Sequence, residues 1–195
     1  MNYELRISIS SQDLNQIVGG GLSVGIAKSV GGSQGPAVAW IAFRPLSSNS
    51  VTFEDRYSVY ATFSPPQPGA VIQVMSEEQG QLGGVYTFRN NFFQSGSGGP
   101  GNALTIQNEQ QGNLGFGLSQ RATVNGAPSG GPTNVDSLPT GQRGSFEPKN
   151  TLQVFLAQQV RNGTILSQVP FNALRVNVSS GPVNIRFENG QFVLA

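Results

Sequence analysis

Apolar and polar residues alternate along most of this chain with the two-residue period of a half-buried β-strand. Leu5, Ile7 and Ile9 begin the pattern. Further alternating or short apolar runs lie at 22–26, 37–43, 51–53, 57–63, 70–75, 85–88, 104–106, 114–118, 152–156, 164–169 and 174–178. A last pair of runs flanks Asn189-Gly190, a dipeptide that favours the positive φ angles of a tight hairpin. The pattern therefore predicts an all-β protein.

One segment near the amino terminus also fits a helical stripe, because apolar residues recur there at three- and four-residue steps from Leu14 to Ile26. The three consecutive glycines at 19–21 oppose a long helix, since each would cost about 1 kcal/mol in a helix interior. We therefore expect a short turn or helix at 13–18 and a strand from Leu22.

The hydrophobic pattern occurs twice. The segment 22–28 (LSVGIAK) matches 114–120 (LGFGLSQ), with apolar residues at the same alternate positions. Four more matches follow in the same order: Val30-Gly31-Gly32 with Val124-Asn125-Gly126, Phe53-Glu54 with Phe146-Glu147, Val59-Tyr60 with Val154-Phe155, and Gly69-Ala70-Val71-Ile72 with Gly163-Thr164-Ile165-Leu166. Matches separated by nearly half the chain predict a duplicated unit.

The repeat leads to a specific expectation for the fold. A chain of 195 residues can bury a core as one domain, so we expect a single β domain over 1–195. Its repeat halves would span about 1–93 and 102–195, joined by a Gly/Ser/Pro linker at 94–101, and 125–144 would be a long loop. Each half alone would leave one face of its sheet uncovered. The predicted fold is a β-sandwich or closed barrel of about ten to twelve short antiparallel strands, built from two pseudo-twofold related repeats.

Charge and composition exclude several classes of function. Eleven basic and ten acidic residues are dispersed along the chain and form no basic stripe. We therefore expect no nucleic-acid binding. Polarity comes mainly from Asn, Gln, Ser and Thr, which suits sugar binding or self-association. The chain lacks cysteine, its first residues lack the pattern of a signal peptide, and no apolar run reaches bilayer length. We expect a soluble protein, cytoplasmic as synthesised or released without a classical signal peptide.

Candidate catalytic groups are few. The absence of histidine removes the commonest general base, the hydrolase triads and the usual zinc sites. A carboxylate pair of the glycosidase kind is the remaining option, and the repeat matches Glu54 with Glu147. Both residues are better explained as partners of nearby Arg56 and Lys149 in solvated ion pairs. We therefore expect no enzyme activity, no catalytic residue, no metal site and no cofactor.

Aromatic residues beside polar ones mark a candidate ligand site. Sugar sites combine an aromatic face with amide or guanidinium groups, and adjacent exposed aromatic residues also occur where a protein touches a membrane. A third interpretation is that the aromatic residues close the core of the first half. The densest such cluster is Tyr86, Arg89, Asn90, Asn91, Phe92 and Phe93.

Three functions remain open from the sequence. The first is a non-enzymatic binding protein of the lectin or pore-forming, insecticidal toxin type, which would recognise a glycan or a membrane surface through its loops. The second is a structural, self-assembling or inclusion-forming protein, since edge strands with few charges favour homo-oligomers. The third is a carboxylate-dependent glycosidase.

Overall fold

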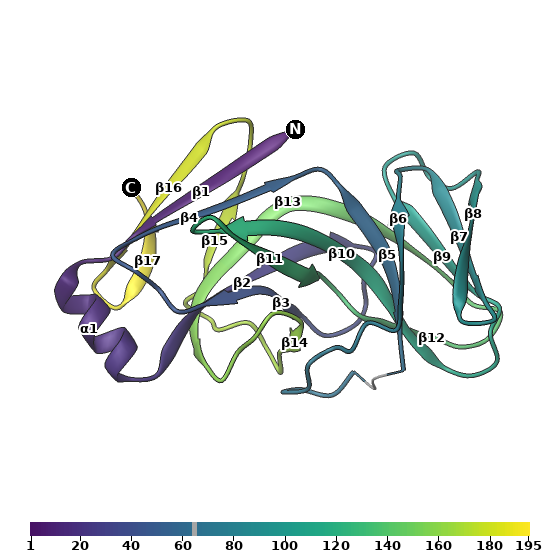
Figure 1. Cartoon of the computed structure of the whole chain (residues 1–195), viewed down its shortest axis with the longest axis horizontal. Helices are drawn as coiled ribbons and strands as arrows, with labels where there is room; N and C mark the ends of the chain where they lie inside the picture. Colours follow the sequence, from purple (N-terminus) through teal and green to yellow (C-terminus); the bar gives the residue numbers. More distant parts are fainter. Residues whose placement is uncertain (64–65) are drawn as a thin grey trace.

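The computed structural model of the chain describes residues 1–63 and 66–195, and two β-sheets account for most of them (Figure 1). Sheet I contains, in spatial order, β17 (Gln191–Leu194), β16 (Pro182–Glu188), β1 (Asn2–Ser8), β4 (Ser48–Glu54), β10 (Leu114–Val124), β5 (Tyr57–Thr62) and β6 (Ser76–Gly80). Two further strands of sheet I, β11 (Ala127–Pro132) and β12 (Asp136–Leu138), pair with β10.

Sheet II has a similar size. It contains, in order, β14 (Thr164–Ile165), β3 (Val38–Phe43), β2 (Leu22–Gly31), β13 (Arg143–Gln158), β9 (Leu104–Asn108), β7 (Gly84–Arg89) and β8 (Phe92–Ser97), and β15 (Leu174–Asn177) pairs with β13. The hairpins β16–β17 and β7–β8 lie at opposite ends of the molecule's longest axis (Figure 1).

The all-β, sandwich-like fold is confirmed, with three corrections. Within the described residues the two sheets do not close into a barrel. Both sheets are mixed, because β1 pairs in parallel with β16 and β7 pairs in parallel with β9. The described residues form 17 strands rather than about a dozen, and β10 and β13 are long, with 11 and 16 residues. Parallel pairing joins strands that are far apart in the chain, so local alternation does not reveal it.

Two other predictions were wrong about irregular segments. The predicted loop at 125–144 contains β11 and β12. Gly130 lets β11 approach β10, because it adopts a φ of +92° and a Cβ there would overlap the backbone of Gln120. Residues 94–97 of the predicted linker are strand residues at the end of β8.

The predicted amino-terminal helix is present as α1 (Ser11–Gly19), two residues longer at its start than expected. Ser10 caps it by accepting a hydrogen bond from the backbone N–H of Asp13 at 3.1 Å. The helix ends at Gly20 and Gly21, and Gly21 has a φ of +68°. This nine-residue helix is the one helix in the described part of the chain, and it is too short to cross a bilayer.

Buried side chains form two large clusters and a small one. The first large cluster includes Trp40, Leu5 and Phe53, and the second includes Phe88, Phe116 and Phe146. The small cluster is Val38, Tyr60, Ile72, Val135 and Ile165. Each fully buried large apolar side chain stabilises the fold by about 1.5–3 kcal/mol relative to exposure. The polar site described next lies against Phe53, on the margin of the first cluster.

Candidate functional site

A groove of about 770 Å³ lies on sheet I near the point where β4 ends and β5 begins. Thr52 and Glu54 line it, and they alternate along β4 with the core residues Val51 and Phe53. Because successive side chains of a strand point to opposite faces, the groove walls belong to the face of sheet I turned away from the core. β1, β5, β6, β10 and β16 supply the other strand residues of the groove.

The groove coincides with an interruption in strand pairing. β4 pairs with β10 as far as Phe53 opposite Ala122, and β5 resumes the pairing with Ser58 opposite Ser119. Both strands run antiparallel to β10, so they act as one long strand broken at residues 55–56. Gln120 of β10 lies at this break, and its side chain Nε2 donates to the backbone O of Glu54 at 2.6 Å.

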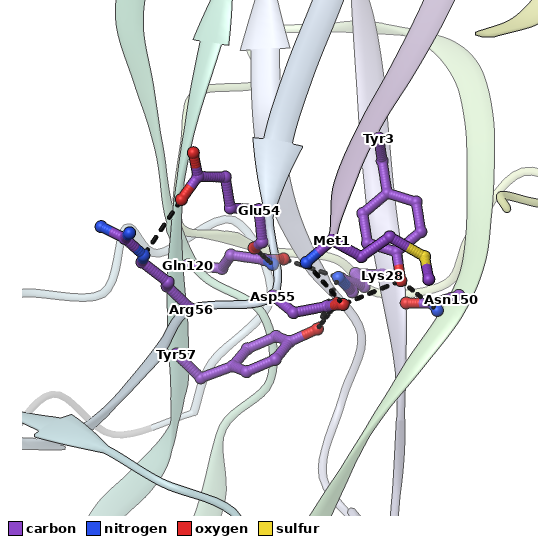
Figure 2. A network of polar contacts seen from close by, with 9 residues as sticks. All are labelled: Met1, Tyr3, Lys28, Glu54, Asp55, Arg56, Tyr57, Gln120 and Asn150. Carbon is purple, nitrogen blue, oxygen red and sulfur yellow. Dashed lines mark hydrogen bonds and ion pairs between the residues drawn. The ribbon is translucent and has the colours of Figure 1, made fainter. Parts of the chain in front are cut away.

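A polar network lies at the same break (Figure 2). The hydroxyl of Tyr3 donates to Asp55 Oδ2 at 3.0 Å, and the hydroxyl of Tyr57 donates to Asp55 Oδ1 at 3.4 Å. Asn150 Nδ2 donates to the Tyr3 hydroxyl oxygen at 2.8 Å, and the amino nitrogen of Met1 lies 3.5 Å from Asp55 Oδ2. Asp55 therefore joins β1 to β5, and Tyr3 extends the network to β13.

Lys28 enters the network from sheet II and is only 6% exposed. Its Nζ donates to Gln120 Oε1 at 2.6 Å and to the Tyr57 hydroxyl oxygen at 3.4 Å. The same nitrogen lies 4.7 Å from the ring centroid of Phe53, 5.1 Å from that of Tyr57 and 5.4 Å from that of Trp40. Three rings at these distances favour the charged ammonium through cation–π attraction.

Burial dominates the electrostatics of this network. It lowers the pKa of Lys28 from 10.5 to about 7, although the Asp55 carboxylate acts in the opposite direction. Burial raises the pKa of Tyr57, and the negative charge of Asp55 raises it further. Burial also raises the pKa of Tyr3, and the hydrogen bond to Asp55 and then the charge of Asp55 raise it further. Both tyrosines are therefore protonated donors at neutral pH, whereas Lys28 changes charge near pH 7.

The groove walls carry charges that are mostly neutralised in pairs. Arg56 Nε lies 3.0 Å from Glu54 Oε2, and the two are drawn together in Figure 2. Glu4 is paired with Arg6 at 2.7 Å, and this hydrogen bond lowers the pKa of Glu4. Two charged groups on the walls remain outside ion pairs between described residues. They are Glu77, which accepts a hydrogen bond from the Ser119 hydroxyl, and Arg121.

The candidate residues from the sequence lie elsewhere, at the β7–β8 hairpin. Tyr86 and Phe93 are buried in the second core cluster, which agrees with the interpretation that aromatic residues close the core. Asn90 and Asn91 form the turn, with φ values of 52° and 68°.

The rest of this cluster is exposed. Arg89 and Phe92 flank the turn, and Phe92 is 49% exposed. The structure thus places two of the six residues in the core and four at the hairpin tip, and whether that tip binds a ligand stays a prediction.

The carboxylates Glu54 and Glu147 do not share a site. Glu54 lines the groove on sheet I, whereas Glu147 lies on β13 of sheet II beside Lys149, with 2.5 Å between their charged atoms. Among the described residues, no three acidic side chains gather closely enough to hold a metal ion.

No feature of the sequence indicated the groove directly. Thr52, Ser119 and Arg121 are spread over two halves of the chain, and each is an ordinary polar residue on the exposed side of a strand. The available signal was the polar residues at two-residue steps, Ser119, Arg121 and Thr123, which mark one side of a strand but not its neighbours.

Comparisons of the chain with protein-family models, with curated proteins and with solved structures found no match.

Proposed function

We propose that this protein is a non-enzymatic binding protein and that its ligand, a hydroxyl-rich molecule of the glycan class, occupies the groove on sheet I. The supporting observation is the groove of about 770 Å³ with walls of hydrogen-bonding side chains. Small-molecule sites commonly have volumes of about 300–1,000 Å³. A site on the sheet surface replaces the loops that the sequence suggested as the recognition elements.

The wall chemistry favours a polyol. Ser58, Gln79 and Thr123 offer hydroxyl and amide groups, and Glu54 and Glu77 add carboxylate acceptors. Sugar hydroxyls both donate and accept, so closely spaced groups of both kinds match them. The nearby rings of Tyr3, Phe53 and Tyr57 are at most 8% exposed, so the ligand would be recognised by hydrogen bonds rather than by ring stacking.

Binding without catalysis fits the groove better than glycoside hydrolysis. A glycosidase needs one carboxylate as a general acid and a second one across the scissile bond. Glu54 and Glu4 are held in ion pairs with arginines, and the matched pair Glu54 and Glu147 is divided between the two sheets. The glycosidase alternative predicts turnover of a glycoside that Glu54→Gln abolishes while binding persists.

Self-assembly is the second candidate, favoured by the edge strand β8 of sheet II. Its six residues, FFQSGS, contain neither a charge nor a proline, and these are the usual features that keep an edge strand from pairing. β6, which ends sheet I, carries Glu77 and Glu78. Light scattering that shows a monomer from micromolar to millimolar concentration would exclude this candidate.

We further infer that the two halves descend from a duplicated unit. Gly25 on β2 lies opposite Phe155 on β13, and Gly117 on β10 lies opposite Tyr60 on β5. The repeat matches Gly25 with Gly117 and Tyr60 with Phe155, so each pair joins a glycine of one half to the matched aromatic residue of the other half. At each glycine an added Cβ would overlap the facing ring.

A glycan array with two matched variants tests the proposed function. Thr52→Trp places a large side chain on the groove wall, and Ser95→Trp places one at an exposed position of β8, outside the groove. We expect Thr52→Trp to weaken glycan binding about tenfold or more and Ser95→Trp to leave it unchanged. Wild-type protein that binds no glycan on the array, or equal effects of the two variants, would contradict the proposal.

A further inference from the structure

We propose that the groove ligand carries an anionic group, a carboxylate or a sulfate, and that Arg121 binds it. This inference rests on the proposed function and narrows its ligand class from glycans in general to acidic glycans. The starting observation is that Arg121 lines the groove without a hydrogen bond or ion pair to another described side chain.

The other arginines around the groove are already engaged. Arg56 Nε lies 3.0 Å from a carboxylate oxygen of Glu54, and Arg6 binds both carboxylate oxygens of Glu4, at 2.7 and 3.0 Å. A ligand anion would have to displace a carboxylate from either of them. Arg121 requires no such displacement, so its five N–H donors are available to the ligand.

The position of Arg121 adds hydroxyl groups on both sides. It lies on β10, and Ser119 and Thr123 follow the same face at two-residue steps. Each step is about 7 Å along a strand, which is close to the size of one sugar ring. An acidic sugar bound at Arg121 can therefore place its hydroxyl groups near Ser119 or Thr123.

The charge of Glu77 on the groove wall would orient the bound ligand. Glu54 and Glu4 are neutralised by their arginines, so Glu77 is the wall carboxylate outside an ion pair with a described residue. Glu77 is held at Ser119, two residues from Arg121 along β10. A ligand anion is attracted at Arg121 and repelled at Glu77, whereas hydroxyl groups suit Glu77 as an acceptor. The groove is thus polarised, with an anion end and a polyol end.

The experiment uses paired probes on the full chain by titration calorimetry at low and physiological salt. The probes are tetragalacturonate and its methyl ester, 3′-sialyllactose and lactose, and sodium acetate as a free carboxylate. We expect at least one acidic sugar to bind about tenfold more tightly than its neutral partner, which corresponds to one charge-assisted bidentate contact. Acetate alone should bind weakly, since it lacks the hydroxyl groups.

Variants of Arg121 test whether this residue causes the preference for acidic sugars. Arg121→Gln should remove the acidic preference, so that an acidic sugar and its neutral partner bind with affinities within about twofold of each other, while Arg121→Lys should restore part of the preference. Arg89→Gln, at the β7–β8 hairpin tip, is the matched control and should retain the full preference.

The outcomes separate this inference from the function on which it rests. Equal wild-type affinity for acidic and neutral sugars, or an acidic preference that survives Arg121→Gln, overturns the inference and leaves glycan binding standing. Tight binding of acetate with no contribution from the sugar overturns the acidic-glycan class. Failure of every sugar to bind overturns both proposals.

Discussion

The broken β4–β5 strand of sheet I and strand β13 of sheet II differ at one position that the proposed repeat makes comparable. In sheet I the strand breaks at Glu54-Asp55-Arg56, whereas β13 of sheet II continues through Glu147-Pro148-Lys149 with a bulge before Leu152. Both sites keep a surface ion pair, between Glu54 and Arg56 and between Glu147 and Lys149. The two sites therefore differ mainly in the residue between the two charges, which is Asp55 in sheet I and Pro148 in sheet II.

The side chain of Asp55 can accept hydrogen bonds, whereas the side chain of Pro148 cannot. Its carboxylate accepts hydrogen bonds from Tyr3 and Tyr57, and these contacts hold the broken strand against β1. Proline has no polar side chain and no N–H donor, so the matching site in sheet II has no such network. The sheet that carries the groove is thus the one with a polar residue, Asp55, at its strand break.

A second asymmetry lies where the sheets meet. Lys28 of β2 and Gln120 of β10 are matched by the repeat and hydrogen-bond to each other at 2.6 Å. One position carries an ionisable group and the other a neutral amide. A single buried lysine can thus avoid like-charge repulsion, because its counterpart is a neutral amide whose oxygen accepts a hydrogen bond from Lys28.

The largest expected effect tests the two glycine–aromatic pairs. In Gly117→Ala the new Cβ meets both the Tyr60 ring and the backbone O of Asn134, whereas in Gly25→Ala it meets the side chain of Phe155. Backbone cannot move as easily as a ring, so we expect about 3 kcal/mol or more of destabilisation for Gly117→Ala and less for Gly25→Ala. Urea unfolding measures both.

A rescue variant completes this test. Adding Phe155→Leu to Gly25→Ala should recover part of the lost stability, because leucine leaves room beside the new methyl group. Equal losses in the two single variants would show that the pairs are structurally equivalent despite Asn134.

The next effect concerns the charge of Lys28. Its pKa is about 7 in the folded protein and 10.5 is the ordinary value, so above pH 7 the unfolded state binds more protons. The free energy of unfolding should therefore rise with pH, by about 2–3 kcal/mol between pH 7 and 9, before the tyrosines titrate. Below pH 7 Lys28 is protonated in both states and contributes no slope.

Two lysine variants isolate that slope. Lys28→Met should flatten the rise between pH 7 and 9, because methionine does not titrate. The only other lysine, Lys149, has a side chain that is 43% exposed, so Lys149→Met should keep the wild-type slope. If the slope persists in Lys28→Met, a group other than Lys28 causes it.

The smallest effect tests Asp55 itself. Asp55→Asn removes the charge that both tyrosine hydroxyls contact, and we expect a loss of about 1 kcal/mol at pH 7. It also removes the carboxylate that raises the pKa of Lys28, so that pKa should fall below its wild-type value. NMR titration of the Lys28 side chain measures the shift, and an unchanged pKa would contradict the electrostatic coupling.

Local patterns predicted the elements that depend on nearby residues. The alternation of Leu5, Ile7 and Ile9 predicted β1, and Asn189-Gly190 predicted the turn between β16 and β17. The same reasoning failed at 125–144, because a Gly- and Pro-rich segment forms strands when a long partner such as β10 supplies the hydrogen bonds.

The sequence by itself determined that the protein is built of strands and lacks histidine and thiol chemistry, since both follow from residue types and their two-residue spacing. Only the tertiary structure decided where the groove lies. Its walls come from β1, β4, β5, β6, β10 and β16, and most of these strands become neighbours through pairings between residues far apart in the chain. Alternation reports which side of a strand faces solvent, but strand order depends on the packing of the whole domain.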